Sequence, residues 1–119
     1  MSAVAFTVED GVARVTLDAP PLNILTRAVL GDLCGAFTEL GARRDLRVLL
    51  VGAAGKHFSA GADVGEHLPP HHAAMIPEFL SAVTALAEFP LPTIAAVRGR
   101  CLGGGFELVQ AVDLIVAAE

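Results

Sequence analysis

Three short, unbroken apolar runs are the feature that most constrains how this chain can fold. They are Val48–Val51, Thr93–Val97 and Leu114–Ala118, and none shows a strict alternation of apolar and polar residues. Short continuous runs of this kind are typical of parallel strands, which are covered on both faces of their sheet. A membrane-spanning helix needs about 20 apolar residues in a row, so these runs are too short to form one. We therefore expect a buried parallel sheet and no membrane partner.

The segments around these runs indicate an α/β fold. Two β-type runs, Ala3–Glu9 and Val12–Asp18, flank Asp10 and Gly11, which can both adopt the positive φ of a tight hairpin turn. Pro77 is tolerated in the first turn of a helix, so the regular part of the second helix is expected from near Ile76. The expected helices run from the Thr26 N-cap to about Arg43, over Ala73–Phe89 and over Phe106–Val112. A hairpin followed by alternating helices and strands predicts crossover helices.

Composition restricts the class of protein further. The chain has 119 residues, of which 54% are hydrophobic and 18% charged, with a formal net charge of −5. This length allows one domain, and the apolar content excludes a disordered chain. The acidic balance argues against nucleic acid as a partner, because binding to phosphates needs clustered Lys and Arg. A mean hydropathy of +0.62 is high for a small domain, so either one face is buried against another surface or the chain is part of a larger fold.

The N-terminus and the cysteines indicate a cytoplasmic protein. The first residues lack the basic start and the long apolar core of a signal peptide. The two cysteines, Cys34 and Cys101, form neither a disulfide framework nor a CxxC pair. We therefore expect a cytoplasmic chain with both thiols reduced.

The first candidate site is the glycine-rich segment before the third expected helix. Gly103, Gly104 and Gly105 allow a ligand to approach the backbone closely, and the N–H groups at a helix start point outward. Glu107 follows in the first turn, so the segment combines donors for an anion with an acid/base group. The plainer interpretation is a tight turn in which Glu107 only complements the helix dipole. A nucleotide loop is excluded, because Leu108 replaces the last glycine of the dinucleotide fingerprint and no Gly-Lys-Ser/Thr is present.

The second candidate site, Phe58–Asp63, follows the strand expected at Arg47–Val51. Ligands of α/β sheets bind at the carboxyl ends of strands, where small side chains leave backbone groups accessible. By itself this segment is most simply a turn of small residues. Two such loops after two strands are more informative, because one N–H from each can converge on a single oxygen. That arrangement is an oxyanion hole, which stabilises negative charge as it develops.

The histidines and the basic residues give weaker signals. The histidines are His57, His67, His71 and His72. Pro69 and Pro70 prevent a helical pair of His67 and His71, so we expect a solvated loop and no metal site. Lys56 and Arg98 lie near the two loops and could contact phosphates, although exposed charge is the simpler interpretation. No histidine is placed beside Cys101 by the sequence, so we expect no nucleophilic role for it.

Three segments together carry a family resemblance. They are Pro20-Pro21-Leu22-Asn23-Ile24-Leu25, Lys56-His57-Phe58-Ser59-Ala60-Gly61-Ala62-Asp63 and Arg98-Gly99-Arg100-Cys101-Leu102-Gly103-Gly104-Gly105-Phe106-Glu107-Leu108. In this order and spacing, over essentially the whole chain, they resemble the enoyl-CoA hydratase/isomerase (crotonase) superfamily. The resemblance implies a spiral of β-β-α units, with residues 1–119 as the N-terminal part of one crotonase-like domain. It also implies an acyl-CoA thioester as the small-molecule substrate, no separate cofactor, and a homotrimer or hexamer.

The resemblance also implies roles for individual residues. The two backbone N–H groups that stabilise a thioester enolate would belong to Ala62 and Gly104. Glu107 would match the first of two catalytic glutamates of the hydratases and would act on water or shuttle a proton. The second would lie shortly beyond the position of Glu119, outside this sequence. The residues implied to bind the substrate or CoA are Leu22, Ile24, Ala60, Gly61, Ala62, Asp63, Val64, Gly103 and Gly104.

These matches favour the reversible hydration of an enoyl-CoA or dienoyl-CoA thioester. Many simple enoyl-CoA isomerases lack a glutamate at the position of Glu107, and the segments Pro20–Leu25 and Phe58–Pro69 look like those of cyclic dienoyl-CoA hydratases of aromatic degradation. Isomerisation, other acyl-CoA chemistry of the family, and an inactive acyl-CoA-binding fragment remain as alternatives. The resemblance also implies that the strand Leu114–Ala118 would be covered by segments that this chain does not contain.

Overall fold

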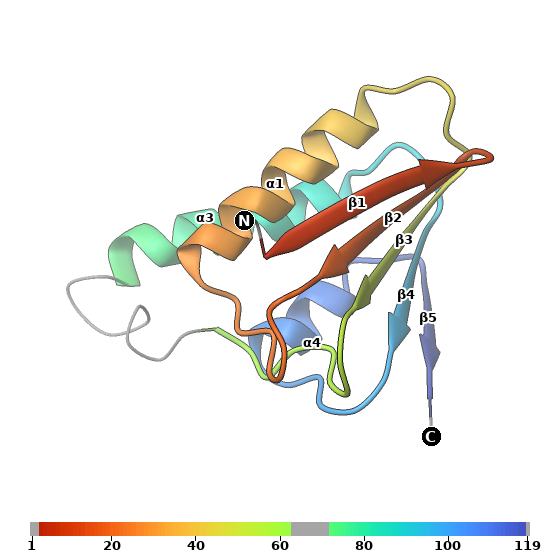
Figure 1. The fold of residues 1–119 in the computed structure, drawn as a ribbon. Helices are drawn as coiled ribbons and strands as arrows, with labels where there is room; N and C mark the ends of the chain where they lie inside the picture. The colour runs from red at the N-terminus through yellow and green to blue at the C-terminus, as the bar shows by residue number, and fades with distance from the viewer. Residues whose placement is uncertain (1–2, 63–71, 119) are drawn as a thin grey trace.

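The computed structural model describes residues 3–62 and 72–118, which form a sheet with helices packed on it (Figure 1). The strands are β1 (Val4–Glu9), β2 (Val12–Leu17), β3 (Val48–Ala53), β4 (Thr93–Val97) and β5 (Leu114–Ala117). The helices are α1 (Arg27–Gly41), α3 (His72–Ala87) and α4 (Gly104–Val109). This succession confirms the α/β class expected from the sequence. No helix in the described part of the chain is both long enough and apolar enough to cross a membrane.

The sheet is mixed, with its strands in the order β1-β2-β3-β4-β5. β1 and β2 are antiparallel, and the φ angles of 51° at Asp10 and 80° at Gly11 confirm the expected hairpin turn. β2, β3, β4 and β5 are parallel neighbours, so each connection between them crosses over and contains a helix. The carboxyl ends of the parallel strands therefore lie at one edge, the lower edge in Figure 1.

One face of the sheet contributes to the core. In β2, Ala13, Val15 and Leu17 are buried, whereas Arg14 between them is exposed. α1 and α3 contact each other and lie on one side of the sheet (Figure 1). Side chains from the sheet, the helices and the loops form one buried cluster, which includes Leu30, Leu33, Phe37, Leu49, Phe58, Leu86 and Leu108. The core therefore anchors the strands whose ends carry the candidate site.

β5 is exposed, which corrects the expectation of a third buried strand. Leu114, Ile115 and Val116 have exposed fractions of 56%, 45% and 56%. β5 is the last strand of the sheet, and it lies away from α1 and α3 (Figure 1). Ala96 of the neighbouring β4 is also exposed. An apolar run indicates a strand, but its burial depends on what packs against it.

α1 begins where the sequence predicts it. Thr26 is its N-cap, and the Thr26 Oγ1 accepts a hydrogen bond of 3.2 Å from Val29 N. The buried residues of α1 form one stripe at three- and four-residue steps: Val29, Leu30, Leu33, Ala36, Phe37 and Leu40. The helix ends at Gly41, two residues before the expected end at Arg43. Arg43 instead forms an ion pair with Asp45.

α3 begins at His72, which corrects the expectation of a regular helix from near Ile76. Pro77 lies inside the helix, where it lacks the N–H that would bond to the preceding turn. Further along the same helix, Ala82 and Leu86 are buried in the core. This burial stabilises α3 and offsets the hydrogen bond that Pro77 cannot make.

Two further boundaries differ from those expected. β3 continues to Ala53 rather than ending at Val51, because Gly52 and Ala53 pair with Thr16 and Leu17 of β2. α4 begins at Gly104 rather than at Phe106, and it is preceded by Gly103 with a positive φ of 50°. The first turn of α4 therefore includes the glycines that were expected to lie in a loop.

Candidate functional site

Three loops meet at the edge formed by the carboxyl ends of the parallel strands. We name them loop A (residues 18–26) after β2, loop B (residues 54–62) after β3, and loop C (residues 98–103) after β4. A parallel bridge joins Leu25 of loop A to Ala62 of loop B, and another joins Ser59 of loop B to Cys101 of loop C. The fold thus brings together the three segments that carry the sequence resemblance.

Asn23 joins loop A to loop B. It is 1% exposed, and its φ of 47° is in the left-handed region that asparagine tolerates. Its Nδ2 donates hydrogen bonds of 2.9 Å to the carbonyls of Ala54 and His57, and its Oδ1 accepts one of 2.8 Å from Ala19 N. No role for Asn23 was expected from the sequence. An asparagine two residues after a pair of prolines was the available signal, because asparagine often bonds to backbone groups in turns.

Loop C is held against loop B. Phe58 N donates a hydrogen bond of 2.9 Å to Arg98 O, and His57 Nδ1 accepts one of 2.9 Å from Arg100 N. Gly99 allows this close contact, because a Cβ on Gly99 would lie 2.5 Å from His57 Nδ1. The course of loop C toward α4 is therefore set by loop B.

The two N–H groups singled out from the sequence lie close together. The Ala62 nitrogen is 3.5 Å from the position that a Cβ on Gly104 would occupy, and the Gly104 nitrogen is 3.5 Å from the equivalent position on Gly61. Among the described residues, neither N–H has a protein acceptor. The Gly104 N–H lacks an acceptor because Gly104 begins α4, and the first N–H groups of a helix have no carbonyl partner within the helix. Two nitrogens whose N–H groups have no acceptor among the described residues thus lie near each other.

Glycines and one aromatic ring shape this region. Gly103 and Gly61 have φ angles of 50° and 108°, which residues with a Cβ rarely adopt. A Cβ on Gly61 would also lie 3.1 Å from Leu102 O. The Phe79 ring of α3 lies beside Gly104, with its Cε2 3.0 Å from the position of a Cβ there. An apolar surface therefore borders the two donors.

Glu107 is exposed in the first turn of α4, three residues after Gly104. Residues three apart share a face of a helix, so the carboxylate lies on the same side of α4 as Gly104. The backbone of Glu107 is fixed by a hydrogen bond of 3.0 Å from its N to Gly103 O. The expected acid/base group is therefore within one helical turn of a donor, and its catalytic role stays a prediction.

The other residues expected to bind the substrate lie in loops A and B or outside the described residues. Leu22, Ile24 and Ala60 are half-buried, and Ala60 N donates a hydrogen bond of 2.9 Å to Leu22 O. Asp63 and Val64 lie outside the described residues. The roles of all five in CoA binding stay predictions.

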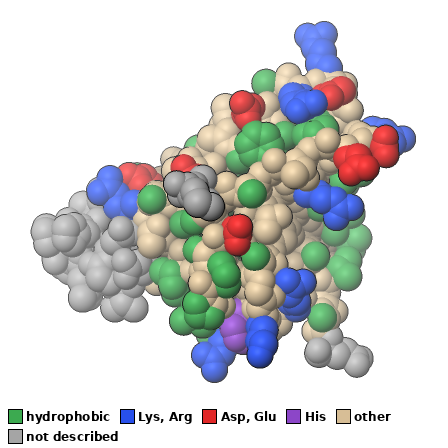
Figure 2. All heavy atoms as spheres, in the orientation of Figure 1, with side chains coloured by type: hydrophobic (Ala, Val, Ile, Leu, Met, Phe, Trp, Pro, Cys, Tyr) green, Lys and Arg blue, Asp and Glu red, His purple; other side chains and the backbone are tan. Residues whose placement is uncertain are grey.

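Basic groups gather near the loops. Figure 2 shows Lys and Arg side chains with a histidine at the lower edge of the molecule. The Arg98 side chain donates hydrogen bonds of 2.8 Å to Gly55 O and 3.0 Å to Ala53 O, so it braces loop B. The described part of the chain contains no group of three His, Cys, Asp or Glu side chains that could hold a metal ion. His67 and His71 lie outside the described residues.

Cys101 and Cys34 are both free thiols in the described structure. Burial raises the pKa of the Cys101 thiol, because desolvation disfavours the thiolate. A raised pKa makes a poorer nucleophile near neutral pH, which agrees with the expectation that Cys101 is not nucleophilic.

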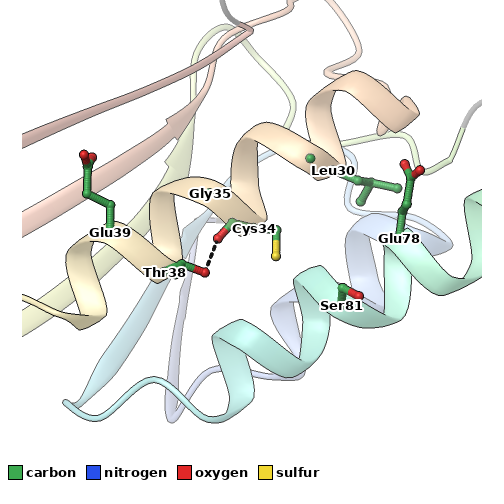
Figure 3. A pocket seen from close by; sticks show the side chains of 8 residues that line it. Leu30, Cys34, Gly35, Thr38, Glu39, Glu78 and Ser81 are labelled. Atoms are coloured by element: carbon green, nitrogen blue, oxygen red, sulfur yellow. Dashed lines mark hydrogen bonds between the residues drawn. The ribbon is translucent and has the colours of Figure 1, made fainter.

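A groove of about 510 Å³ lies between α1 and α3 (Figure 3). Cys34, Thr38 and Glu39 line it from α1, and Glu78 and Ser81 line it from α3. The described residues that line this groove all belong to the two helices, so it is separate from the site at loops A, B and C.

Solved structures show the class of protein to which this fold belongs. DspI of Pseudomonas aeruginosa superposes with a TM-score of 0.93 and 30% identity, over 98% of this chain and 46% of that chain. An enoyl-CoA hydratase/carnithine racemase from Magnetospirillum magneticum superposes with a TM-score of 0.92 and 30% identity, over 98% and 46% of the two chains. The fold is the crotonase fold, as the sequence resemblance implied.

Residues 7–119 match the family described as Enoyl-CoA hydratase/isomerase, and the chain belongs to this family. The (7aS)-7a-methyl-1,5-dioxo-2,3,5,6,7,7a-hexahydro-1H-indene-carboxyl-CoA hydrolase of Mycobacterium tuberculosis (strain ATCC 25618 / H37Rv) is 38% identical, over 100% of this chain and 50% of its own length. The cyclohexa-1,5-dienecarbonyl-CoA hydratase of Thauera aromatica is 36% identical, over 92% of this chain and 43% of its own length. The chain thus spans about half the length of these relatives.

Proposed function

We propose that this chain provides two oxyanion donors and one carboxylate for the hydration of an enoyl-CoA or dienoyl-CoA thioester. This proposal rests on the proximity of the Ala62 and Gly104 nitrogens, whose N–H groups have no acceptor within residues 3–62 and 72–118. Fixed donors stabilise the charge that develops on a thioester oxygen more than they stabilise the neutral carbonyl. Membership of the family supports an acyl-CoA substrate, and the two relatives described above are both named for CoA compounds.

In this mechanism Ala62 N–H and Gly104 N–H donate hydrogen bonds to the thioester oxygen, and Glu107 accepts a proton from water. The water oxygen forms a bond to Cβ while the π bond between Cα and Cβ breaks. The electron pair of that π bond forms a new double bond between Cα and the carbonyl carbon, and the carbonyl π pair moves onto the thioester oxygen, which gives an enolate. The enolate then collapses, and Cα takes a proton from Glu107 or from a second acid. Water and the thioester supply every atom and electron of the reaction, so the proposal needs no separate cofactor.

The binding and assembly expectations belong to the same proposal. Leu22, Ile24 and residues 60–64 would hold the CoA portion beside the donors, with Gly103 at the entrance to α4. Residues 1–119 would be the N-terminal part of a crotonase-like domain in a cytoplasmic homotrimer or hexamer. The second candidate function is binding of acyl-CoA without catalysis, and the experiment below distinguishes the two.

The experiment compares the chain with its Glu107→Gln variant, using crotonyl-CoA as the probe. Hydration is followed by the loss of the conjugated-enoyl absorbance, and binding is measured by calorimetry. We expect turnover to fall at least about 10²-fold in Glu107→Gln, with little change in affinity, because a general acid/base contributes on this scale. Glu88→Gln is the matched control, since Glu88 is exposed in the turn directly after α3.

Each outcome separates the candidates. Full activity of Glu107→Gln contradicts the acid/base role. Binding of crotonyl-CoA by the unsubstituted chain without hydration favours the second candidate, an acyl-CoA-binding protein. Isomerisation of a 3-enoyl-CoA without hydration of crotonyl-CoA favours the isomerase alternative. Absence of both binding and turnover contradicts the proposed function.

A further inference from the structure

Ser59 is a buried residue that contacts all three loops of the site. It is 0% exposed in loop B. Its N donates a hydrogen bond of 3.0 Å to Arg100 O, and its O accepts one of 3.0 Å from Leu102 N, so its backbone pairs with loop C on both sides. Ser59 lies in the candidate segment Phe58–Asp63, but no role was expected for it, because a serine among small residues does not reveal its burial.

The hydroxyl of Ser59 links loop A to the end of loop B. Ser59 Oγ donates a hydrogen bond of 2.8 Å to Asn23 O and accepts one of 3.1 Å from Gly61 N. Both bonds are buried. A buried hydroxyl with both a donor bond and an acceptor bond is satisfied, and each bond fixes one backbone group of the site.

Two hydrogen bonds hold Gly61, and the one on its carbonyl sets the direction of the Ala62 N–H. Gly61 N is held by Ser59 Oγ, and Gly61 O accepts a hydrogen bond of 2.9 Å from Leu25 N. In a trans peptide, the C=O of one residue and the N–H of the next point in opposite directions. The Gly61–Ala62 peptide is trans, so the Ala62 N–H points away from Leu25.

Ser59 also holds the segment that carries the second donor. Leu102 N bonds to Ser59 O, and a Cβ on Gly105 would lie 2.8 Å from the Ser59 Cβ. Gly104 lies between these two contacts. Ser59 therefore restrains the backbone on both sides of the Gly104 N–H. Through Gly61 N it also restrains the Ala60–Gly61 peptide, which directly precedes the peptide that carries the Ala62 N–H.

We propose that Ser59 is a positioning residue, whose buried hydroxyl aligns the Ala62 N–H with the Gly104 N–H toward one thioester oxygen. The inference rests on the proposed function and deepens it, because Ser59 acts through the two donors without touching the substrate. A hydroxyl that served only the stability of the fold would have no effect on how strongly a bound carbonyl is polarised. Polarisation of the carbonyl is therefore the decisive readout.

The experiment uses the 119-residue chain and crotonyl-CoA labelled with ¹³C at the thioester carbonyl. The infrared band of that carbonyl moves to lower frequency when its oxygen accepts hydrogen bonds. Three variants are compared with the unsubstituted chain. Ser59→Ala removes both hydrogen bonds of the hydroxyl, whereas Ser59→Cys keeps a side chain of similar size whose sulfur is a weaker hydrogen-bonding group. Ser81→Ala is the matched control. Ser81 also donates a hydrogen bond to a backbone carbonyl, that of Pro77, but on the exposed side of α3.

In the unsubstituted chain and in Ser81→Ala, we expect the carbonyl band of bound crotonyl-CoA to lie at a lower frequency than that of free crotonyl-CoA. In Ser59→Ala the band should return toward the frequency of free crotonyl-CoA, and in Ser59→Cys it should be intermediate. Where turnover is measurable, kcat should fall by about tenfold to 10²-fold in Ser59→Ala with a smaller change in KM, as expected for displaced catalytic groups. If Ser59→Ala does not fold, Ser59→Cys provides the same comparison.

The outcomes distinguish this inference from the proposed function. A shifted band that is the same in the unsubstituted chain and in the folded Ser59 variants overturns the positioning role and leaves the proposed function intact. Binding of crotonyl-CoA with no shift in the unsubstituted chain overturns both the oxyanion donors and the role of Ser59. Absence of binding contradicts the proposed function itself, and the inference with it.

Discussion

Thr93 and Asp113 form reciprocal hydrogen bonds between the start of β4 and the turn before β5. Asp113 Oδ2 accepts a hydrogen bond of 2.9 Å from Thr93 N, and Asp113 N donates one of 2.9 Å to Thr93 Oγ1. Thr93 is 2% exposed, so water cannot readily replace a lost partner. This pair lies at the amino end of the parallel strands, opposite the edge that carries the candidate site (Figure 1).

Asp113→Ala should lower the free energy of unfolding by about 1–3 kcal/mol, because it leaves the buried N–H of Thr93 without an acceptor. Urea unfolding of the chain measures the change. Asp113→Asn keeps an acceptor oxygen and should cost less. Asp45→Ala is the control, since its ion pair with Arg43 is exposed and contributes little. A loss in Asp113→Ala no larger than in Asp45→Ala would contradict this account.

Gly105→Ala should destabilise the protein and weaken acyl-CoA binding. The added Cβ would lie 2.8 Å from the Ser59 Cβ and 2.9 Å from Ser59 O, so buried backbone must move. Such overpacking typically costs about 1–3 kcal/mol. Gly35→Ala in α1 is the matched control, because no atom lies within 4 Å of its added Cβ.

Gly35→Ala, the control, should raise the free energy of unfolding, whereas Gly105→Ala should lower it. Alanine in place of glycine within a helix stabilises it by roughly 0.5–1 kcal/mol, so Gly35→Ala should unfold at a higher urea concentration. Both substitutions are measured in the same unfolding series. Equal effects of the two substitutions would show that the contact between Gly105 and Ser59 does not limit the packing of loop B.

The ion pair between Arg27 of α1 and Glu78 of α3 should make a small contribution to stability that depends on pH and salt. The hydrogen bond from Arg27 lowers the pKa of Glu78. A carboxyl whose pKa is lowered by folding stabilises the protein above its unfolded pKa, and this contribution is lost as pH falls through the folded value. Because both side chains are exposed to solvent, with accessible fractions of 45% and 36%, salt should weaken the effect.

Unfolding of Glu78→Gln at neutral pH and in acid checks this prediction. The unsubstituted chain should be slightly more stable than the variant at neutral pH and low salt, and the difference should vanish in acid or in high salt. Glu88→Gln is the control, since Glu88 is exposed in the turn directly after α3. A difference that persists in acid would assign the effect to packing of the side chain rather than to its charge.

Cys101 should be alkylated more slowly than a small reference thiol at the same pH. Burial raises the pKa of Cys101, and the thiolate is the reactive form. A Cys34→Ala variant leaves Cys101 as the remaining thiol, so the rate with iodoacetamide can be followed by mass. The midpoint of its pH–rate profile should lie above that of the reference and should approach it in urea. A midpoint below the reference would instead indicate an activated cysteine.

Local chemistry made much of the fold predictable. Asp10 and Gly11 allow the positive φ angles of the hairpin, and Thr26 caps α1 through its own hydroxyl. The class of fold and the meeting of two glycine-containing loops also followed from the sequence. Where the expected ends of a helix or strand were wrong, tertiary contacts had outweighed the local conformational preference of the residues. Pro77 lies inside α3 although it weakens a helix, because the rest of that helix contributes to the core.

The sequence by itself determined the strands, the helices and the residue types that could form an oxyanion site, because these depend on patterns a few residues long. Only the tertiary structure decided that β5 is exposed and that Ser59 and Asn23 join the loops. The Ser59 hydroxyl reaches Asn23 O across 36 positions of the chain, and the Asn23 amide reaches His57 O across 34. Contacts over such separations arise from the packing of the whole sheet, and no local pattern of residues encodes them.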